Sequence, residues 1–262
     1  MLRSLRTASL GMSAQQTGVD NIANNLANAN TTAFKRSTMV FHDLLYQNIQ
    51  VAGSDSDGEN AGPASLQLGH GAAAISTVRN HEQGGFVETG NSLDLAINGD
   101  GFFQVRTSDG EIAYTRDGTF TVNSEGMLVT QNGAEIEPDI AIPPESVEIF
   151  VNEQGMVSAR LQGETAPVEL GQIELARFFN PNGLRSLGGN LYEQTVASGD
   201  PEIGVGGEAG FGRIRQGFLE SSNVDVVQEM VNLISAQRAY EINSKMVTTS
   251  EDMLQVTNNL KR

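Results

Sequence analysis

Residues 223–260, NVDVVQEMVNLISAQRAYEINSKMVTTSEDMLQVTNNL, decide the fold because they contain neither glycine nor proline. This composition predicts one long helix. The helix can begin at Asn223, or at Asp225 with Gln228 three residues later, as in a capping box. A helix of about 38 residues, at about 1.5 Å per residue, is about 57 Å long.

Two apolar stripes run along this predicted helix. The first stripe has a seven-residue period and the second lies beside it, so the apolar face is wider than a two-stranded coiled coil needs. We expect such a helix to pack against helices of other copies of the chain; the simpler alternative is one intramolecular helix pair. The first stripe is Val226, Leu233, Tyr240, Val247 and Leu254, and the second is Ile242, Met246, Met253, Val256 and Leu260.

The N-terminal end predicts a second, shorter helix with a heptad seam. Asparagines spaced at i, i+3, i+4 and i+7 share one face of it. They indicate either a fraying helix end, because Asn favours caps and turns, or an amide face that hydrogen-bonds neighbouring chains. The seam consists of Leu5, Ala8, Met12, Gln15, Val19, Ile22, Leu26 and Ala29, and the asparagines are Asn21, Asn24, Asn25 and Asn28.

The centre of the chain reads as β structure. Residues 51–220 hold all 7 prolines and 27 of the 29 glycines, and Asn-Gly and Asp-Gly pairs separate short apolar runs such as 93–97 and 102–105. These pairs are typical of tight hairpins and predict an antiparallel domain. The segment VNSEGM at 122–127 recurs as VNEQGM at 151–156, which suggests two related hairpins. Residues 51–65 and 198–212 are expected to be flexible.

The expected fold is therefore α+β, with long N- and C-terminal helices forming a coiled-coil-like inner domain around a mainly antiparallel β domain. The expected organisation is an N-terminal helical segment at 1–50, a polar loop and extended connector at 51–82, the β domain at 83–197, a connector and returning strand at 198–220, and the C-terminal helix at 221–262.

Charge is distributed unevenly along the chain. Residues 51–220 carry 8 basic and 25 acidic side chains, a net charge of −17, whereas residues 1–50 carry +2 and residues 221–262 carry −1. This acidity argues against nucleic-acid binding, which needs clustered Lys and Arg. Acidic middle domains would repel each other in a stack, so association must come from the ends and should strengthen with added salt.

Few residues suggest a chemical site. The chain has no Cys, so it has no disulfide and no thiolate zinc site. The motif G-x-G-x-x-A at 204–209 follows an acidic loop and precedes a strand-like segment, which is the wrong context for a dinucleotide. The acidic segment 55–59, DSDGE, resembles a calcium-binding loop, but its glycine stands two positions earlier than in an EF-hand loop. No His group has ligand spacing and no carboxylate pair stands out, so we expect no catalytic residue, cofactor or metal.

The sequence also predicts no membrane span and no ordinary cleaved signal. No apolar run reaches about 18 residues. The N-terminus, MLRSLRTASLGMSAQQ, has two Arg but no apolar core and no credible cleavage site.

Four segments, in order, resemble signatures of the bacterial flagellar rod and hook family, and together they span nearly the whole chain. They are NIANNLANANTTAFKR at 21–36, NGDGFF and YTRDGTF at 98–103 and 114–120, and MVNLISAQRAYEINSK at 230–245. The resemblance implies a structural subunit, not an enzyme, of which many copies stack helically around a channel. The terminal helices would lie inside, the β domain outside, and the assembly would be a rigid hollow shaft that transmits torque from motor to hook.

Within the family, FHDLLYQ at 41–47, the following polar loop, QRAYEINSK at 237–245 and the chain length favour a subunit of the distal rod. A proximal rod or hook subunit is the alternative, and a secreted carbohydrate-binding or hydrolytic β domain with helical arms is the alternative of another class. Ala33 stands where the family usually has Gly, which implies strain or a different turn if that Gly has positive φ.

The resemblance further implies export by the flagellar type III apparatus without a cleaved signal, and a position in the periplasmic rod that reaches the outer membrane. The implied partners are other copies of the chain, proximal rod subunits, the hook protein, the peptidoglycan and outer-membrane ring proteins, and the export apparatus. The expected assembly interface consists of Leu5, Met12, Val19, Ile22, Asn25, Leu26, Asn28, Phe34, Val226, Met230, Leu233, Gln237, Tyr240, Ile242, Val247 and Leu254.

Overall fold

The computed structural model describes residues 2–50, 65–163 and 166–260, which fold as two compact units. The end unit comprises Met1–Ala27, Ser37–Val78 and Asp225–Arg262, and the central unit comprises Asn28–Arg36 and Arg79–Val224. Both units are therefore discontinuous in sequence. Of the loop predicted to be flexible at 51–65, only residue 65 is described; its calcium-like segment 55–59 lies outside the described residues.

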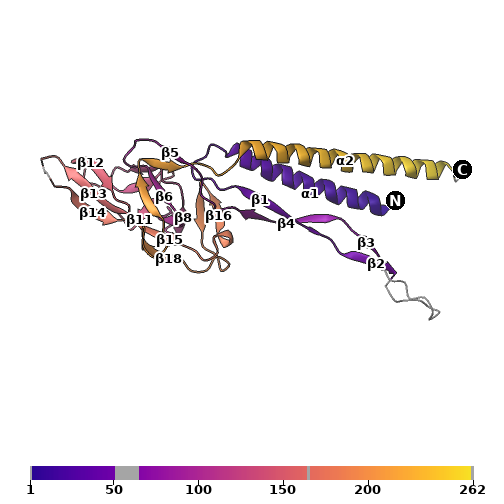
Figure 1. Cartoon of the computed structure of the whole chain (residues 1–262), viewed down its shortest axis with the longest axis horizontal. Helices are drawn as coiled ribbons and strands as arrows, with labels where there is room; N and C mark the ends of the chain where they lie inside the picture. Colours follow the sequence, from indigo (N-terminus) through magenta and orange to yellow (C-terminus); the bar gives the residue numbers. More distant parts are fainter. Residues whose placement is uncertain (1, 51–64, 164–165, 261–262) are drawn as a thin grey trace. The chain divides into compact units, whose positions relative to one another are not determined.

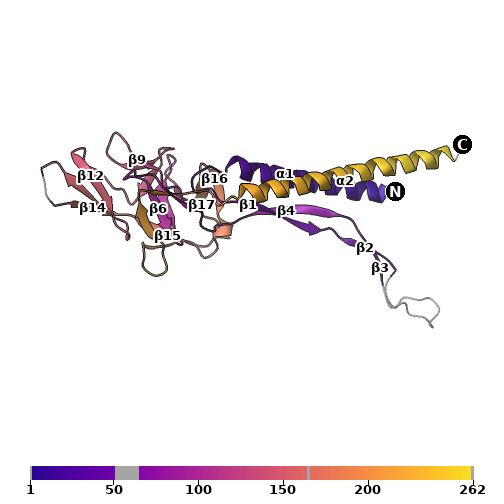
Figure 2. The same ribbon diagram turned by 45° about the horizontal axis from the view of Figure 1, so that its top comes forward.

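Two helices form one side of the end unit and confirm the predicted α+β fold class. The helices α1 (Leu2–Ala27) and α2 (Val226–Asn259) lie side by side in both views (Figures 1 and 2). Asp225 is the N-cap of α2, as predicted, and its Oδ1 accepts hydrogen bonds from the N–H groups of Val227 and Gln228 at 2.9 and 3.2 Å. The Gln228 side chain does not complete a capping box, because its Nε2 donates to Asn232.

Two glycines inside α1 allow its neighbours to come close. A Cβ added to Gly11 would lie 3.0 Å from the Asn243 amide nitrogen of α2, and one added to Gly18 would lie 3.4 Å from the Phe41 ring. Glycine inside a helix costs about 1 kcal/mol relative to alanine. These close approaches give a packing reason for both residues.

The rest of the end unit consists of strands. The N-terminal helix ends at Ala27, close to the end of its heptad seam, and residues 37–50 pair as strands although they were expected within the helical segment. Residues 66–79, expected as a connector, are also strands, because they provide the pairing partners of 37–50. The strands are β1 (Ser37–Asp43), which pairs with β4 (Ala72–Arg79), and β2 (Tyr46–Gln50), which pairs with β3 (Leu66–Gly69).

The central unit contains the predicted antiparallel β structure. Its main sheet has nine strands in the order β16-β17-β8-β7-β11-β10-β9, with β15 joining β7 to β18. A three-stranded sheet β12-β13-β14 and the pairs β19-β6 and β20-β5 complete the unit. The bounds are β5 (Phe86–Glu88), β6 (Leu95–Asn98), β7 (Phe102–Arg106), β8 (Ile112–Thr115), β9 (Phe120–Val122), β10 (Leu128–Thr130), β11 (Glu135–Glu137), β12 (Ser146–Val151), β13 (Met156–Leu161), β14 (Val168–Gln172), β15 (Glu174–Arg177), a 3-10 turn η1 (Pro181–Gly183), β16 (Arg185–Gly188), β17 (Leu191–Glu193), β18 (Glu202–Val205), β19 (Arg213–Gln216) and β20 (Phe218–Glu220).

The hydrophobic core lies in the central unit. Ile97, Phe103 and Leu175 are completely buried in it, and they come from three different strands, β6, β7 and β15. A second cluster, around Tyr114 and Phe178, packs rings edge to face with centroids 4.7 Å apart. Burial of this kind is the main stabilising contribution to a folded domain.

The repeated hexapeptide forms two equivalent hairpin turns, which confirms the prediction. Asn123 accepts hydrogen bonds at its side-chain oxygen from the second and fourth N–H groups after it, and Asn152 does the same. The glycines at the same position of each turn, Gly126 and Gly155, have φ of 85° and 87°. The same local chemistry thus closes the β9–β10 and β12–β13 hairpins.

Residues 198–212 are not the flexible connector that their glycine content suggested. They contain β18, which pairs with β15 along its whole length. The glycine content suggested flexibility, but Gly204 of β18 is needed for close packing. A Cβ added to it would lie 2.4 Å from the Phe211 ring.

Candidate assembly interface

One face of α2 packs in the helix pair. Its two buried residues are Glu229 and Ala236, and Leu233, Val247 and Leu254 of the first apolar stripe are half-buried. Steps of three, four and seven residues place these side chains on one helix face. The remaining first-stripe residues, Val226 and Tyr240, stay exposed.

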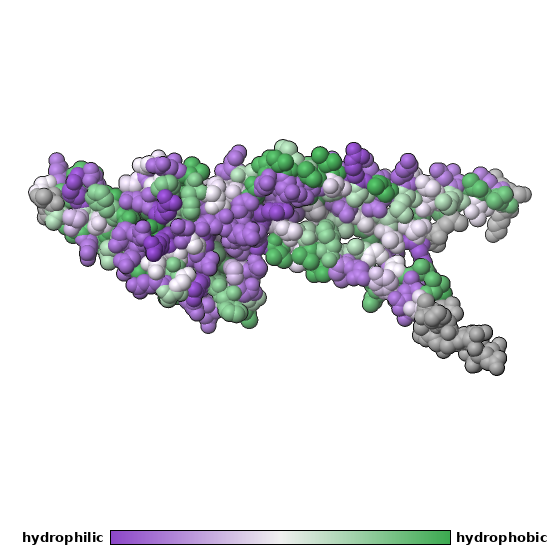
Figure 3. Space-filling view, in the orientation of Figure 1, coloured by the Kyte–Doolittle hydropathy of each residue, from purple (hydrophilic) through white to green (hydrophobic). Residues whose placement is uncertain are grey.

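The second apolar stripe of α2 is open. Its five residues, from Ile242 to Leu260, are exposed by 50 to 82%. Four more apolar residues near the start of the helix are also exposed, and Figure 3 shows apolar surface over these first turns. These four are Val227, Met230, Val231 and Ile234. A helix that keeps so much apolar surface in water is typical of one that binds another helix.

Two grooves in the end unit lie along the predicted interface. One has a volume of about 360 Å³ and is lined by Val19, Gln237 and Tyr240 among others. The other has a volume of about 430 Å³ and is lined by Ile242 and Met246 among others. Grooves next to exposed apolar side chains can receive the ridges of a packed helix.

The predicted interface residues of the N-terminal region differ in their accessibility. Asn25 and Phe34 are buried inside their own units, so we leave both out of the interface proposed below. The partly exposed ones are Leu5, Met12, Val19, Ile22, Leu26 and Asn28.

The asparagine face of α1 bonds within the chain, which neither alternative anticipated. Asn21 and Asn25 each donate from Nδ2 to the Ser37 carbonyl at 2.8 Å, and the Asn25 side-chain oxygen accepts from the Ser37 N–H at 3.0 Å. Asn25 also approaches the buried Glu229 of α2 at 3.4 Å. The amides thus fix the start of β1 against α1.

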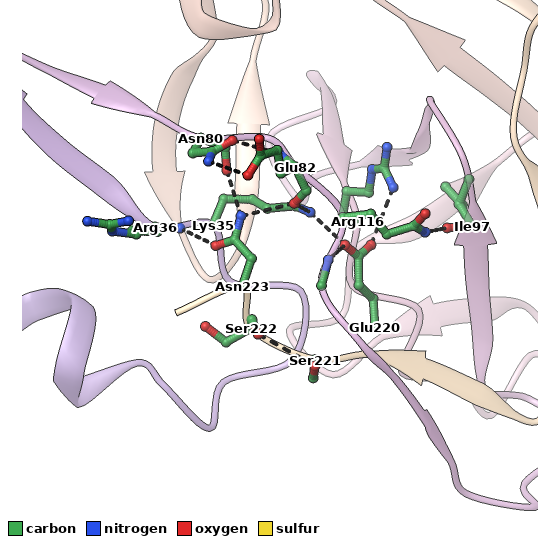
Figure 4. A network of polar contacts seen from close by, with 12 residues as sticks. Lys35, Arg36, Asn80, Glu82, Ile97, Arg116, Glu220, Ser221, Ser222 and Asn223 are labelled. Atoms are coloured by element: carbon green, nitrogen blue, oxygen red, sulfur yellow. Dashed lines mark hydrogen bonds and ion pairs between the residues drawn. The ribbon is translucent and has the colours of Figure 1, made fainter. Parts of the chain in front are cut away.

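A buried ionic network lies in the central unit (Figure 4). Lys35 Nζ lies 2.6 Å from Glu220 Oε1 and donates to the Glu82 carbonyl at 2.7 Å. The other oxygen of Glu220 pairs with Arg116 at 3.3 Å, and the Gly84 N–H donates to the carboxylate at 2.9 Å. The side chains of Lys35 and Glu220 are almost completely buried. One carboxylate therefore compensates two cations in the interior.

Asn223 extends this network to the points where the chain enters the unit (Figure 4). Its Oδ1 accepts from the Arg36 N–H at 2.7 Å, and its Nδ2 donates to the carbonyls of Asn80 and Glu82 at 2.9 Å each. The Phe34 carbonyl accepts from the Asn223 N–H. Three segments that are far apart in sequence are thereby tied together.

Burial controls the ionisation of this region. Desolvation lowers the pKa of Lys35, against the opposing attraction of Glu220. Burial also lowers the pKa of His81 to about 4, and the charges of Lys35, Arg116 and Arg79 act in the same direction. His81 is therefore neutral at pH 7, and its ring packs edge to face on Phe102 and Tyr192.

Ala33 adopts the left-handed conformation. It has φ of 54°, is buried, and its N–H donates to the Glu220 carbonyl at 2.8 Å. A side chain in this region of φ costs about 1 kcal/mol or more. The first of the two expected consequences, strain at Ala33, is therefore the one observed.

Sequence reasoning missed two features. It missed the ionic network, because nothing local links Lys35 to Glu220. It also missed the apolar surface of the end-unit strands, where Tyr46, Ile49 and Ile75, together with Leu45 between β1 and β2, are exposed by more than half. The alternation of apolar and polar residues at 66–68 was the available signal for these strands.

Within residues 2–50, 65–163 and 166–260, no group of three or more His, Cys, Asp or Glu side chains is placed to hold a metal ion. In the same ranges, no helix is long and apolar enough to cross a membrane.

The fold and the exposed helix define a class of protein: a structural subunit with a closed β unit and a helical unit whose apolar surface is open. Three family models match in chain order. The flagella basal body rod protein model matches residues 5–35, the flagellar hook protein FlgE/F/G D1 domain matches 96–159, and the flagellar basal body rod FlgEFG protein C-terminal model matches 215–260.

Curated relatives match over essentially the whole length. The chain is 48% identical to the flagellar basal-body rod protein FlgG of Borreliella burgdorferi, over 100% of both chains. It is 46% identical to FlgG of Caulobacter vibrioides, over 99% of this chain and 100% of that one, and 38% identical to FlgF of the same organism, over 93% of each. The chain belongs to the FlgE/F/G family of flagellar basal-body rod and hook proteins.

Proposed function

We propose that copies of this chain polymerise helically into the distal part of the flagellar rod. The product is a rigid hollow shaft that transmits torque from the motor to the hook. The higher identity to FlgG than to FlgF of the same organism supports the distal position over the proximal one.

The open second stripe of α2 carries this proposal. The helix pair uses the first stripe of α2 within the chain and leaves Ile242, Met246 and Met253 in water. Covering such side chains on association stabilises an interface by about 25 cal/mol per Å² of apolar area, before the costs of ordering are subtracted. Other copies of the same helix pair are the partners that we propose.

Besides Met246 and Met253 of the open stripe, the proposed interface comprises those predicted interface residues that are exposed or half-buried. They are Leu5, Met12, Val19, Ile22, Leu26, Asn28, Val226, Met230, Leu233, Gln237, Tyr240, Ile242, Val247 and Leu254. The near-neutral charge of residues 1–50 and 221–262 makes contact between copies electrostatically acceptable there.

The remaining parts of the proposal concern location and partners. The subunit is exported by the flagellar apparatus without a cleaved signal and lies in the periplasmic rod. It contacts proximal rod subunits below, the hook protein above, and the ring proteins of the peptidoglycan and outer membrane around it. The role is structural, with no catalytic step.

Electron microscopy of the purified chain at increasing concentration tests the polymer. We expect tubes from the unaltered chain and none from Ile242→Asp, because a buried unpaired carboxylate opposes association. Gln255→Asp adds the same charge at an exposed polar position of α2 and should still form tubes. Absence of tubes from the unaltered chain at every concentration and salt would contradict the proposal. Immunogold labelling of isolated basal bodies tests the distal position.

A further inference from the structure

Arg215 stands on the outer face of β19. Residues alternate between faces along a strand, and the neighbouring Ile214 is buried in the core of the central unit. Arg215 is consequently exposed, next to the strand β20 that follows it in the chain.

Two phenylalanines hold the Arg215 guanidinium. In the β5–β20 pair, Phe86 is opposite Glu220 and Phe218 is opposite Glu88, so the two rings are diagonal neighbours on one face. The Arg215 Cζ lies 4.1 Å from the ring centroid of Phe218 and 5.4 Å from that of Phe86. A planar guanidinium over aromatic rings is positioned in advance while its N–H groups stay available at the edge.

Arg215 differs in its partners from the other arginines between residues 79 and 220. Each of the others donates to an oxygen: Arg79 to the Tyr192 hydroxyl, and Arg106, Arg116, Arg160, Arg177, Arg185 and Arg213 to carboxylates. Within the described part of the chain, Arg215 has no carboxylate within ion-pair distance and donates no hydrogen bond to a protein oxygen. Even Glu88, which is opposite Phe218 in the β5–β20 pair, forms no ion pair with it.

The charge of the central unit indicates what this side chain binds. Residues 28–36 and 79–224 contain 10 basic and 22 acidic side chains. Adjacent central units in a polymer repel each other unless a cation on one meets carboxylates on the next. A rigid unpaired guanidinium is suited to a bidentate contact with a carboxylate, and Arg with aromatic neighbours is typical of the residues that dominate interfaces.

We propose that Arg215, held by Phe86 and Phe218, binds a carboxylate on the central unit of a second copy of this chain. This inference rests on the proposed function, because it supposes a polymer. A groove of about 480 Å³ begins beside it, lined by Phe218, Gly217, Val147 and Phe150 among others. Polar side chains, Glu88 and Glu148 among them, line the groove together with these apolar residues, so it offers the neighbouring copy a mixed surface next to the charged contact.

Chemical cross-linking identifies the partner of Arg215 directly. The chain has only three lysines, Lys35, Lys245 and Lys261, so the background is low. The full-length variant Arg215→Lys, mixed in equal amounts of light- and heavy-nitrogen protein and polymerised, is treated with a carbodiimide, which joins Lys to a nearby carboxylate. Arg213→Lys is the control, because Arg213 lies on the same face but pairs with Glu153 in its own chain.

We expect mixed-isotope peptides joining Lys at position 215 to an acidic residue of the central unit, at least severalfold above the control. Only same-isotope linkages, or a yield equal to the control, would overturn the proposal. A linkage to a different flagellar protein in isolated basal bodies, without one between copies, would also overturn it.

Polymer assembly provides the second measurement. Arg215→Gln should raise the concentration at which tubes form by roughly tenfold, the equivalent of one charge-assisted contact, while its melting temperature stays that of the unaltered chain. Tubes at the unaltered concentration would refute the role of Arg215 and leave the proposed function standing. If the unaltered chain forms no tubes, the proposed function itself fails.

Discussion

The central and end units show what a complete and an incomplete fold look like in one chain. The central unit buries large side chains such as Phe103, Ile97 and Leu175 completely. Among its described residues, the end unit buries only small or polar ones, such as Ala8, Ala14 and Ala236, and it leaves large apolar residues of α2 exposed. We therefore expect the central unit to be stable in the monomer and the end unit to gain stability on assembly.

The largest expected effect contrasts one side chain from each unit. Phe103→Ala should lower the free energy of unfolding by about 4 kcal/mol, because it leaves a cavity in the core. Ile242→Ala should change it by less than about 0.5 kcal/mol in the monomer, because that side chain is already in water. Chemical denaturation of the monomer measures both. A large loss from Ile242→Ala would mean that the end unit has a core of its own.

The buried ionic network should make a large contribution to the stability of the central unit. Glu220→Gln should destabilise the monomer by about 3 kcal/mol, because two buried cations lose their compensating charge. Lys35→Met is the matched control and should cost about 1 kcal/mol, since Arg116 still compensates Glu220. Denaturation at pH 7 distinguishes them. Equal losses from the two variants would contradict the charge assignment.

The stability of the central unit should depend on pH through the titration of His81. Its pKa is about 4 in the folded protein and about 6.5 in the unfolded chain, so the unfolded chain binds the extra proton first as pH falls. The resulting stability is fully present above about pH 6.5 and is lost towards pH 4, in total about 3 kcal/mol. Comparing the unaltered chain with His81→Gln across this range isolates the effect. Parallel pH profiles for the two proteins would disprove it.

The smallest effect is a gain in stability. Ala33→Gly should stabilise the monomer by about 1 kcal/mol, because glycine adopts a φ of 54° without steric cost. Thermal unfolding measures it, with Ala113→Gly, a core alanine outside this conformation, as the destabilising control. A loss of stability at position 33 would show that the Ala33 methyl group contributes more by packing than it costs in backbone strain.

The sequence alone determined the features that repeat along the chain. The heptad residues from Leu5 to Leu26 and from Val226 to Leu254 predicted both helices, and the Asn-Gly and Asp-Gly pairs predicted the antiparallel strands. These predictions hold because periodicity and turn chemistry act over a few residues. The motifs at 21–36, 98–120 and 230–245 indicated the family for the same reason, because each is a short continuous stretch of sequence.

The tertiary structure alone decided which of these residues meet. The two stripes of α2 looked alike in sequence, and only the docking of α1 left the second in water while half-burying most of the first. Lys35 and Glu220 are 185 positions apart, and Arg215 is distinguished from the other arginines only by what surrounds it. Contacts between residues so far apart in sequence depend on how whole strands pack. The burial of a side chain and the compensation of its charge are set by neighbours in space, which no local sequence pattern specifies.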